Sequence, residues 1–268
     1  MTALPDNIDK AAVRHSDPLF LSEPFLRGGH TSTKANGTVT YVRYKGHLFC
    51  VTCAHVYDQQ FVGNGVNWLT VHGRQRYIYQ FGTYLPEGYK SHFISLRARD
   101  SSAPDIAIAR VGEAFPQIHM EPRGKEPIDL DIWNEPNWSD LRVPVAFGYP
   151  TEHKSDADTF VQSSFLGVAA ELTRPISSSD ETFLMASTLE TSNDYYFSGM
   201  SGGAVYAISD SESPLTAIGI VFEGTPGSAA EWAARDSQSF LTRSDIQIRA
   251  YLMTPRNFES WLSIAYDK

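Results

Sequence analysis

The chain of 268 residues contains only two cysteines, Cys50 and Cys53, and it has no long apolar run. A secreted chain of this size more often carries a disulfide framework, so this scarcity favours a reducing, cytoplasmic location. No stretch approaches the roughly 18 consecutive apolar residues that cross a bilayer. Residues 1–20 also lack a basic segment followed by an apolar one. We therefore expect neither a membrane span nor a secretion signal.

Basic residues are also in short supply. The chain has 22 Lys and Arg against 31 Asp and Glu, giving a net charge of −9, and the basic residues form no stripe. Binding to a phosphate backbone requires clustered Lys and Arg, so nucleic acid is not expected as a partner. With 42% hydrophobic and 20% charged residues, the composition is that of a globular protein with a sizeable core.

Short segments that alternate apolar and polar residues recur along the chain, separated by Gly, Pro, Asn and Asp. This pattern predicts β-strands. Residues 113–140 contain four prolines and no sustained period, which predicts a linker between two sets of about six strands. The expected strands are 37–44, 47–53, 76–81, 92–97 and 106–111 in the first set, and 142–148, 160–170, 182–190, 203–208, 215–223 and 246–252 in the second.

One helix is expected, at the C-terminus. Thr254 can cap its start, Pro255 suits the first helical position, and apolar residues then recur at helical spacing. The predicted fold is therefore all-β, with two six-stranded antiparallel β-barrels and a C-terminal α-helix. The expected parts are an N-terminal extension (1–23), a first barrel (24–115), a linker (116–141), a second barrel (142–253) and the helix (254–268).

Residues 199–203 read Gly-Met-Ser-Gly-Gly and place Ser201 among three glycines. Glycine is costly to order, so this density indicates a sharp turn or a close approach of the backbone. Two interpretations fit: a tight turn that leads into a strand, or a nucleophilic serine. The pattern also satisfies the nucleophile turn of α/β-hydrolases, in which the histidine follows the serine. All eight histidines precede Ser201, which excludes that class.

A serine nucleophile requires a base that takes its proton and a third group that orients the base. His55 follows one apolar strand pattern and Asp105 stands immediately before another, so both are expected at strand ends that face a cleft. Taken singly, His55 could be a surface residue and Asp105 could form a turn after Pro104.

Together, the order His55, Asp105 and Ser201 and the residues around them resemble the chymotrypsin/trypsin-like serine peptidases. The spacings of 50 and 96 residues also suit two barrels, one for His55 and Asp105 and one for Ser201. The resemblance spans residues 37–252. It is carried by residues 51–55 (Val-Thr-Cys-Ala-His, against Thr-Ala-Ala-His in the family), 105–109 (Asp-Ile-Ala-Ile-Ala, against Asp-Ile-Ala-Leu), 199–204 (Gly-Met-Ser-Gly-Gly-Ala, against Gly-Asp-Ser-Gly-Gly-Pro) and 219–224 (Gly-Ile-Val-Phe-Glu-Gly, against Gly-Ile-Val-Ser-Trp-Gly).

The resemblance implies that this chain is a serine endopeptidase acting through an acyl-enzyme intermediate. Ser201 would attack the scissile carbonyl, His55 would take its proton and pass it to the leaving amine, and Asp105 would fix the imidazole tautomer. The backbone N–H groups of Gly199 and Ser201 would form the oxyanion hole. A polypeptide is the implied substrate, and no cofactor or metal is implied.

The same resemblance places the substrate-binding residues. Phe222, Glu223 and Gly224 would form the edge on which the substrate backbone pairs as an added strand. Tyr195 and Tyr196, with Phe222, would line the pocket for the side chain that precedes the scissile bond. Because Tyr195 stands where trypsin-type pockets carry an acidic residue, we expect a small or uncharged apolar side chain there rather than Lys or Arg.

Three departures from the family qualify the resemblance. Met200 stands where digestive and clotting enzymes have the aspartate that receives the N-terminus made by zymogen cleavage, so that activation route is not expected. Val56 replaces a cysteine of the disulfide beside the histidine. Residues 145–150 (Val-Ala-Phe-Gly-Tyr-Pro) look like intracellular and bacterial members of the superfamily.

A zinc site is an alternative for one segment, because His47, Cys50, Cys53 and His55 are zinc-binding residue types. In a strand, however, Cys50 would face away from the other three. Two reduced cysteines packed as small hydrophobic residues are therefore expected.

Another alternative keeps the fold without the enzyme: a catalytically silent trypsin-like binding or scaffold module. An active cytoplasmic endopeptidase with no evident pro-segment would need restraint, so regulation by a protein partner or by oligomerisation is expected. The long segment 224–243, beside the expected pocket, is the candidate element for this regulation.

Overall fold

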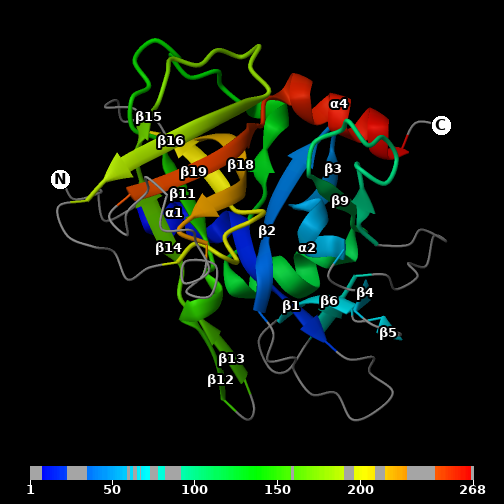
Figure 1. Cartoon of the computed structure of the whole chain (residues 1–268). Coiled ribbons are helices and arrows are strands. Elements are labelled where there is room, and N and C mark those ends of the chain that lie inside the picture. The colour runs from blue at the N-terminus through cyan, green and yellow to red at the C-terminus, as the bar shows by residue number, and fades with distance from the viewer. Residues whose placement is uncertain are drawn as a thin grey trace.

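The computed structural model contains two antiparallel β-sheets that lie beside each other, with a C-terminal helix above them (Figure 1). This confirms the predicted all-β class with a C-terminal helix and is consistent with a trypsin-like double barrel. The residues that the structure describes are 8–22, 35–58, 61–62, 65–66, 68–72, 78–81, 92–157, 160–189, 196–208, 215–227 and 245–266.

The first sheet has eight strands instead of the six that were expected. Its order is β7-β6-β1-β2-β3-β9-β8, and β10 adds to β2 in parallel at the pair Ile128 and Val42. The strands are β1 (Ser16–Ser22), β2 (Ala35–Tyr44), β3 (His47–Thr52), β6 (Trp68–His72), β7 (Ile78–Gln80), β8 (Ile94–Ser95), β9 (Ala107–Arg110) and β10 (Ile128–Asp129).

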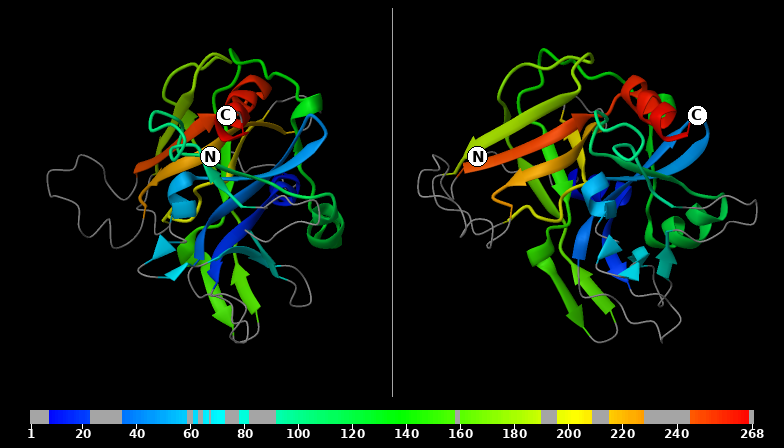
Figure 2. Two further views of the ribbon diagram at one scale, coloured as in Figure 1. Left: turned by 90° about the vertical axis from the view of Figure 1, so that its right-hand side faces the viewer. Right: turned by 45° about the vertical axis from the view of Figure 1, so that its right-hand side comes forward.

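The second sheet has seven strands in the order β14-β11-β17-β18-β19-β16-β15. The single strand expected over 160–170 is two strands here, because β13 (Phe160–Ser163) pairs with β12 (Lys154–Ala157) in a hairpin that projects from the body (Figure 2). A second small pair is formed by β4 (Phe61–Val62) and β5 (Gly65–Val66). The strands of the sheet itself are β11 (Val145–Gly148), β14 (Leu166–Ala169), β15 (Glu171–Leu172), β16 (Thr182–Thr188), β17 (Ala204–Ala207), β18 (Thr216–Thr225) and β19 (Asp245–Leu252).

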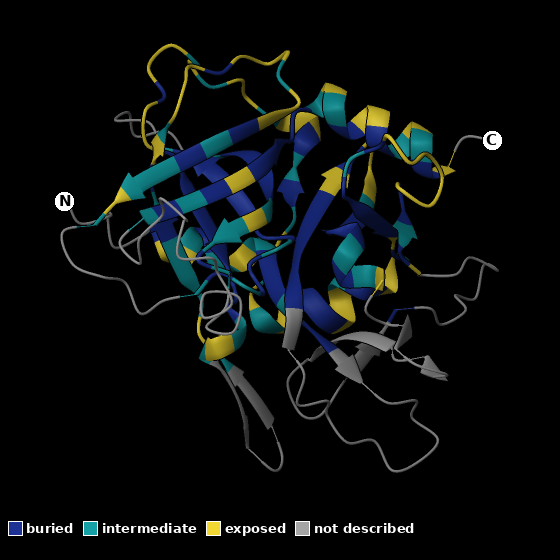
Figure 3. Ribbon diagram, in the orientation of Figure 1, coloured by how far each residue is buried: buried dark blue, intermediate teal, exposed yellow. Residues whose placement is uncertain are grey.

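The C-terminal helix α4 (Pro255–Tyr266) begins where the sequence predicts. The backbone N–H of Asn257 donates to the Thr254 hydroxyl at 3.1 Å, which is the expected N-terminal cap. Phe258 and Trp261 are buried, and they join a cluster that contains core residues of both sheets, such as Val42 and Phe147. The helix therefore packs over the junction of the two sheets, where most strand residues are buried (Figure 3).

Residues 116–132, in the expected linker, form short helical turns and β10. A π-helical turn (Pro116–Met120) is followed by 3-10 turns at Glu121–Arg123 and Leu130–Ile132. Other short helices are α1 (Ile8–Ala12), a 3-10 turn at Val13–His15, α2 (Ala54–Asp58) and a 3-10 turn at Thr151–His153. Among the described residues, no helix is long and apolar enough to cross a membrane.

Residues 16–22, which were expected in an N-terminal extension, form β1 inside the first sheet, between β2 and β6. A buried Asp in a strand is unusual, because Asp rarely enters a sheet core without a partner. The strand forms here because Asp17 is buried against two cations that lie more than a hundred residues away in the chain. The Arg123 guanidinium lies 2.6 Å from Asp17 Oδ2, and Lys125 Nζ lies 3.1 Å from Oδ1.

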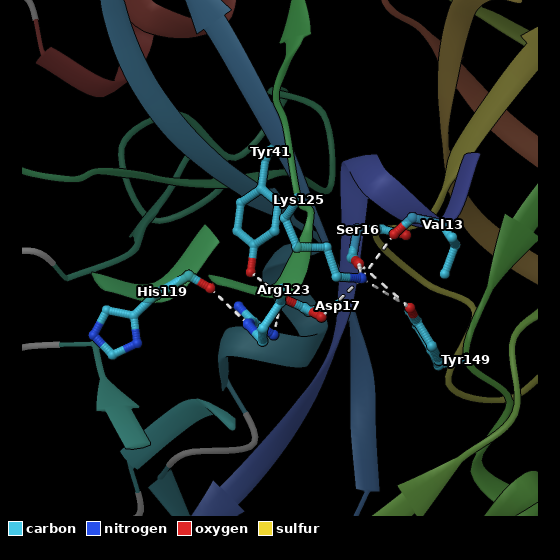
Figure 4. Close-up of polar contacts among 8 residues, drawn as sticks. All are labelled: Val13, Ser16, Asp17, Tyr41, His119, Arg123, Lys125 and Tyr149. Carbon is cyan, nitrogen blue, oxygen red and sulfur yellow. Dashed lines mark hydrogen bonds and ion pairs between the residues drawn. The ribbon is translucent and has the colours of Figure 1, made fainter. Parts of the chain in front are cut away.

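These residues form a buried ionic cluster of Asp17, Tyr41, Arg123 and Lys125 (Figure 4). The Tyr41 hydroxyl donates to Asp17 Oδ2 at 2.5 Å, and burial raises the pKa of that hydroxyl well above its usual value. Lys125 Nζ donates to the backbone oxygens of Val13 and Ser16 at 2.7 and 2.6 Å. Burial lowers the pKa of Lys125, although Asp17 opposes this shift.

His15 carries a pH dependence that follows from its position. Its Nδ1 lies 2.8 Å from the hydroxyl of Tyr206 in the second sheet. Burial lowers its pKa from 6.5 to about 4; Glu126 opposes the shift, and Arg14 and Lys125 add to it. Between these two pH values His15 is protonated in the unfolded chain and neutral in the folded chain. This contribution to stability is complete above pH 6.5 and is lost as the pH falls towards 4.

We therefore expect the free energy of unfolding, measured with urea, to decrease as the pH is lowered from 7 to 5. His15→Gln retains hydrogen-bonding capacity without titrating and should reduce this dependence; the rest is expected from His119, whose pKa burial also lowers to about 4. An unchanged slope in His15→Gln would assign the pH dependence to other groups.

Candidate active site

His55 and Asp105 are brought together by the pairing of β3 with β9. Thr52 lies opposite Ala107 in this pair, so the residues just after β3 and just before β9 emerge at the same edge of the sheet. His55 lies on α2, one turn beyond the strand end where it was expected. Its Nδ1 is 2.7 Å from Asp105 Oδ2, and its backbone N–H donates to Asp105 Oδ1 at 3.0 Å.

The Asp105 carboxylate is held as an anion. The residue is 6% exposed, and its backbone N–H donates to the Tyr251 hydroxyl at 2.9 Å. Burial raises the pKa of Asp105, but the hydrogen bonds and charge of His55, together with the Arg97 guanidinium 3.8 Å away, outweigh burial and leave the pKa below its usual value. An ionised Asp105 can accept an Nδ1–H of His55, which favours the tautomer whose Nε2 carries no proton. A neutral imidazole in this tautomer can act as a base.

The Ser201 loop and the His55 segment share a backbone oxygen as hydrogen-bond acceptor. The carbonyl of Val221 accepts the thiol of Cys53 at 3.2 Å and the N–H of Gly202 at 2.8 Å. Cys53 is two residues before His55, and Gly202 follows Ser201 directly. The structure therefore places all three predicted catalytic residues around one end of the junction between the sheets.

Every carbonyl of the loop from residue 198 to residue 202 has a donor. The Ser198 oxygen accepts from the N–H of Thr151 at 2.7 Å, and the Met200 oxygen accepts from Gly203 at 2.8 Å. The remaining three carbonyls are held by β2: Gly199 by the Thr38 hydroxyl, Ser201 by the Thr38 N–H and Gly202 by the Thr40 hydroxyl, at 2.9, 2.9 and 2.7 Å.

The N–H groups of the same loop divide into two kinds. Those of Met200, Gly202 and Gly203 donate to backbone oxygens. Within the described part of the chain, those of Gly199 and Ser201 have no acceptor. In a trans peptide the C=O and N–H point in opposite directions, so both of these N–H groups point away from the donors that hold Ser198 and Met200. Gly199 is buried and Ser201 is partly buried, so these two N–H groups are available to an anion that lies beside the loop.

The glycines of this loop are required by its geometry. Gly199 and Gly202 have φ of +93° and +91°, a region that residues with a side chain rarely adopt. A Cβ on Gly199 would lie 2.6 Å from the Thr151 hydroxyl. A Cβ on Gly203 would collide with the carbonyl oxygen of Phe147.

The Ser201 hydroxyl itself is turned towards β18. Its Oγ donates to the carbonyl of Phe222 over a long 3.4 Å, and it forms no hydrogen bond with His55. Catalytic hydrogen bonds are often long or misaligned in the absence of substrate. The Ser201–Phe222 bond is weak, and a side-chain rotation is enough to release the hydroxyl.

The structure describes all the predicted pocket residues except Tyr195. Tyr195 and residues 228–243 of the expected regulatory segment lie outside the residues that the structure describes. Tyr196 is half-buried, and the Phe222 ring packs on Tyr251 with 4.4 Å between centroids. Glu223 is exposed and pairs with Arg249 at 3.2 Å.

Gly224 lies against residues that the sequence did not indicate. A Cβ on it would be 2.6 Å from the Cβ of Phe197 and 3.3 Å from the Cδ1 of Ile248. Phe197 and Ile248 are both buried, so they fill the space beside Gly224.

The two cysteines are free and fully buried, and burial raises the pKa of both thiols well above the usual value. Cys53 lies past the end of β3, so the alternation of a strand does not extend to it or to His55. No group of three or more His, Cys, Asp or Glu side chains in the described ranges could hold a metal ion.

Comparison with known proteins gives a structural likeness only. No protein-family model and no curated protein sequence matches the chain. Among solved structures, it is similar to a thermostable serine protease, AL20, from an extremophilic microorganism. The two share 11% identity and a TM-score of 0.48, over 97% of this chain and 100% of the other. A likeness of this extent does not establish a shared activity.

Proposed function

We propose that this protein is a serine endopeptidase that uses Ser201 as nucleophile, His55 as general base and Asp105 as the group that orients His55. The observation that carries the proposal is the pair of backbone N–H groups, on Gly199 and Ser201, that the rest of the loop leaves without acceptors. They lie on and just before the residue whose hydroxyl would attack, as an oxyanion hole requires.

The proposed reaction follows from these positions. When the Ser201 Oγ attacks the scissile carbonyl, its proton passes to Nε2 of His55, and the Asp105 carboxylate stabilises the resulting imidazolium. The carbonyl oxygen becomes an oxyanion that accepts from Gly199 and Ser201, an effect worth about 3 kcal/mol per donor. His55 then returns the proton to the leaving amine as the carbon–nitrogen bond breaks. Water hydrolyses the acyl-enzyme by the same steps in reverse.

A polypeptide substrate is supported by an open strand edge. On the side away from β19, the chain is bonded by residues 202–203 at Val221 and by residues 197–198 at positions 226–227. Between these points, residues 222–224 have no backbone hydrogen bond on that side among the described residues, which supports pairing with a short added strand. The aromatic and aliphatic side chains around Gly224 favour a small or uncharged apolar residue before the scissile bond. As part of the same proposal, the enzyme works in the cytoplasm without a cofactor and is restrained by a protein partner or by oligomerisation.

Labelling by a fluorophosphonate probe tests the proposal. Attack by the Ser201 Oγ on phosphorus forms an O–P bond and expels fluoride, so the wild-type protein should be labelled at Ser201 alone. Ser201→Ala should not be labelled, whereas Ser164→Ala, a change at a serine outside the site, should be labelled at the wild-type rate. Labelling that survives in Ser201→Ala would place the nucleophile elsewhere.

The hydrogen bond from Ser201 to Phe222 favours a second candidate, a catalytically silent binding or scaffold module. If this bond persists when ligands bind, the hydroxyl never reaches His55. Absence of labelling in the folded wild-type protein, with and without candidate partners, would favour this function over the peptidase.

A further inference from the structure

The Thr38 hydroxyl bridges the two sheets directly behind the Ser201 loop. Thr38 lies on β2 in the first sheet and is fully buried. Its Oγ1 donates to the carbonyl of Gly199 at 2.9 Å and accepts from the N–H of Tyr149, just after β11, at 3.0 Å. The hydroxyl has one proton, so these two contacts use it as donor and as acceptor at once.

The loop lacks a polar anchor of its own at this point. The side chain between the two free N–H groups is Met200, which is fully buried and apolar. Apart from the two backbone bonds of Met200, to Phe197 and from Gly203, the contacts that orient the loop are made by neighbouring segments. We propose that Thr38 is a positioning residue that keeps the Gly199 N–H directed at the oxyanion; this inference rests on the proposed peptidase function.

The flexibility of glycine makes such a constraint necessary. Gly199 has no Cβ, so its φ and ψ are limited less by sterics than those of any other residue type. The two peptide planes that flank it are held by different donors: Thr151 holds the Ser198 oxygen, and Thr38 holds the Gly199 oxygen. With both planes held, the direction of the Gly199 N–H is determined. The Gly199 N–H lies in the plane that Thr151 holds, whereas the plane that Thr38 holds links Gly199 to Ser201 and is also tied at its other side by the bond from the Met200 N–H to the Phe197 oxygen. Without the Thr38 contact this link keeps only that second bond, so the Gly199 and Ser201 N–H groups can shift relative to each other.

Removal of the hydroxyl would also leave two buried groups without partners, the Gly199 oxygen and the Tyr149 N–H. Buried polar groups without partners are costly, so the loop would rearrange to recover them. The peptide that carries the Gly199 oxygen can tilt about its remaining bond, from the Met200 N–H to the Phe197 oxygen, and this tilt would shift the Gly199 N–H relative to that of Ser201.

Thr40 offers a matched comparison. It lies two residues from Thr38 on the same face of β2, it is also fully buried, and its hydroxyl also donates to a loop carbonyl, that of Gly202. That carbonyl lies on the far side of Ser201 from Gly199. Thr40→Val therefore removes a hydrogen bond of the same kind without releasing the Gly199 peptide.

The test compares Thr38→Val, Thr38→Ser and Thr40→Val with the wild-type chain. The measurements are the rate of fluorophosphonate labelling, kcat and KM on a peptide selected from a library, and the urea unfolding curve. Thr38→Val should lower the labelling rate and kcat on the order of 10–100-fold with KM little changed, because a misplaced oxyanion donor affects the transition state. Thr38→Ser keeps the hydroxyl and should restore most of the rate.

The outcomes separate the two proposals. If the wild-type protein is labelled and a folded Thr38→Val is labelled as fast, the role of Thr38 is overturned and the peptidase stands. If Thr40→Val loses as much labelling as Thr38→Val, the effect is general loosening of the loop and the specific role fails. If the wild-type protein is not labelled, both proposals fall. Should Thr38→Val not fold, Thr38→Ala removes the hydroxyl with less bulk and repeats the comparison.

Discussion

Replacing Asp105 with asparagine is expected to lower kcat by about 10⁴-fold while the protein remains folded. The oxygen of the introduced amide can still accept the backbone N–H of His55, which Asp105 Oδ1 accepts in the wild type. The NH₂ of that amide would then face Nδ1, and a donor in that position selects the tautomer protonated at Nε2. That tautomer cannot take a proton from Ser201.

The control for this change is Asp58→Asn. Asp58 is exposed at the end of α2 and interacts electrostatically with both His55 and Asp105. Removing the Asp58 charge tests whether the loss of any negative charge near His55 is sufficient to lower kcat. We expect a far smaller effect on kcat than for Asp105→Asn. Both variants should retain the wild-type unfolding curve to within about 2 kcal/mol. A folded Asp105→Asn with kcat within about tenfold of wild type would contradict the assigned role.

Replacing Asp17 with asparagine is expected to destabilise the fold by about 3–5 kcal/mol, because Arg123 and Lys125 would remain buried without a counter-charge. The side chains of Arg123 and Lys125 are each 11% exposed, and that of Asp17 is 6% exposed. Solvent therefore cannot replace the lost carboxylate. The measurement is the free energy of unfolding in urea at neutral pH.

Asp129→Asn provides the contrasting case. It breaks the pair with Arg43, which is 3.3 Å long and partly exposed, and such pairs contribute at most about 1 kcal/mol. The double variant Asp17→Asn with Lys125→Gln should recover part of the loss, because it removes one of the two uncompensated cations. A loss below about 1 kcal/mol in Asp17→Asn alone would show that water or rearrangement solvates the cluster.

The sequence indicates local features of the fold better than distant contacts. The strands with apolar alternation and the helix that begins after Thr254 are predicted, since propensity, capping and burial act on neighbouring residues. The strand that contains Asp17 is not predicted, because its burial depends on cations from residues 123–125. The desolvation cost of a buried charge is offset only when its partner is present, and sequence spacing does not identify that partner.

The same distinction applies to the candidate site. The types and order of His55, Asp105 and Ser201 single them out as candidates from the sequence alone. Thr38 and Tyr251 are not, because a threonine or tyrosine in an alternating strand is typical of any sheet. Their contacts with the Gly199 oxygen and the Asp105 N–H arise only when the strands pair.

The buried ionic cluster also bears on the order in which the chain folds. Asp17 and Tyr41 lie in the first half of the chain, whereas Arg123 and Lys125 come after the last long strand of the first sheet. Closing a contact over this separation has an entropic cost that local strand pairing does not have. A chain emerging from the ribosome would bury Asp17 without its cations until Lys125 had been added. We infer that the first sheet is completed only then, so the N-terminal half is not an independent folding unit.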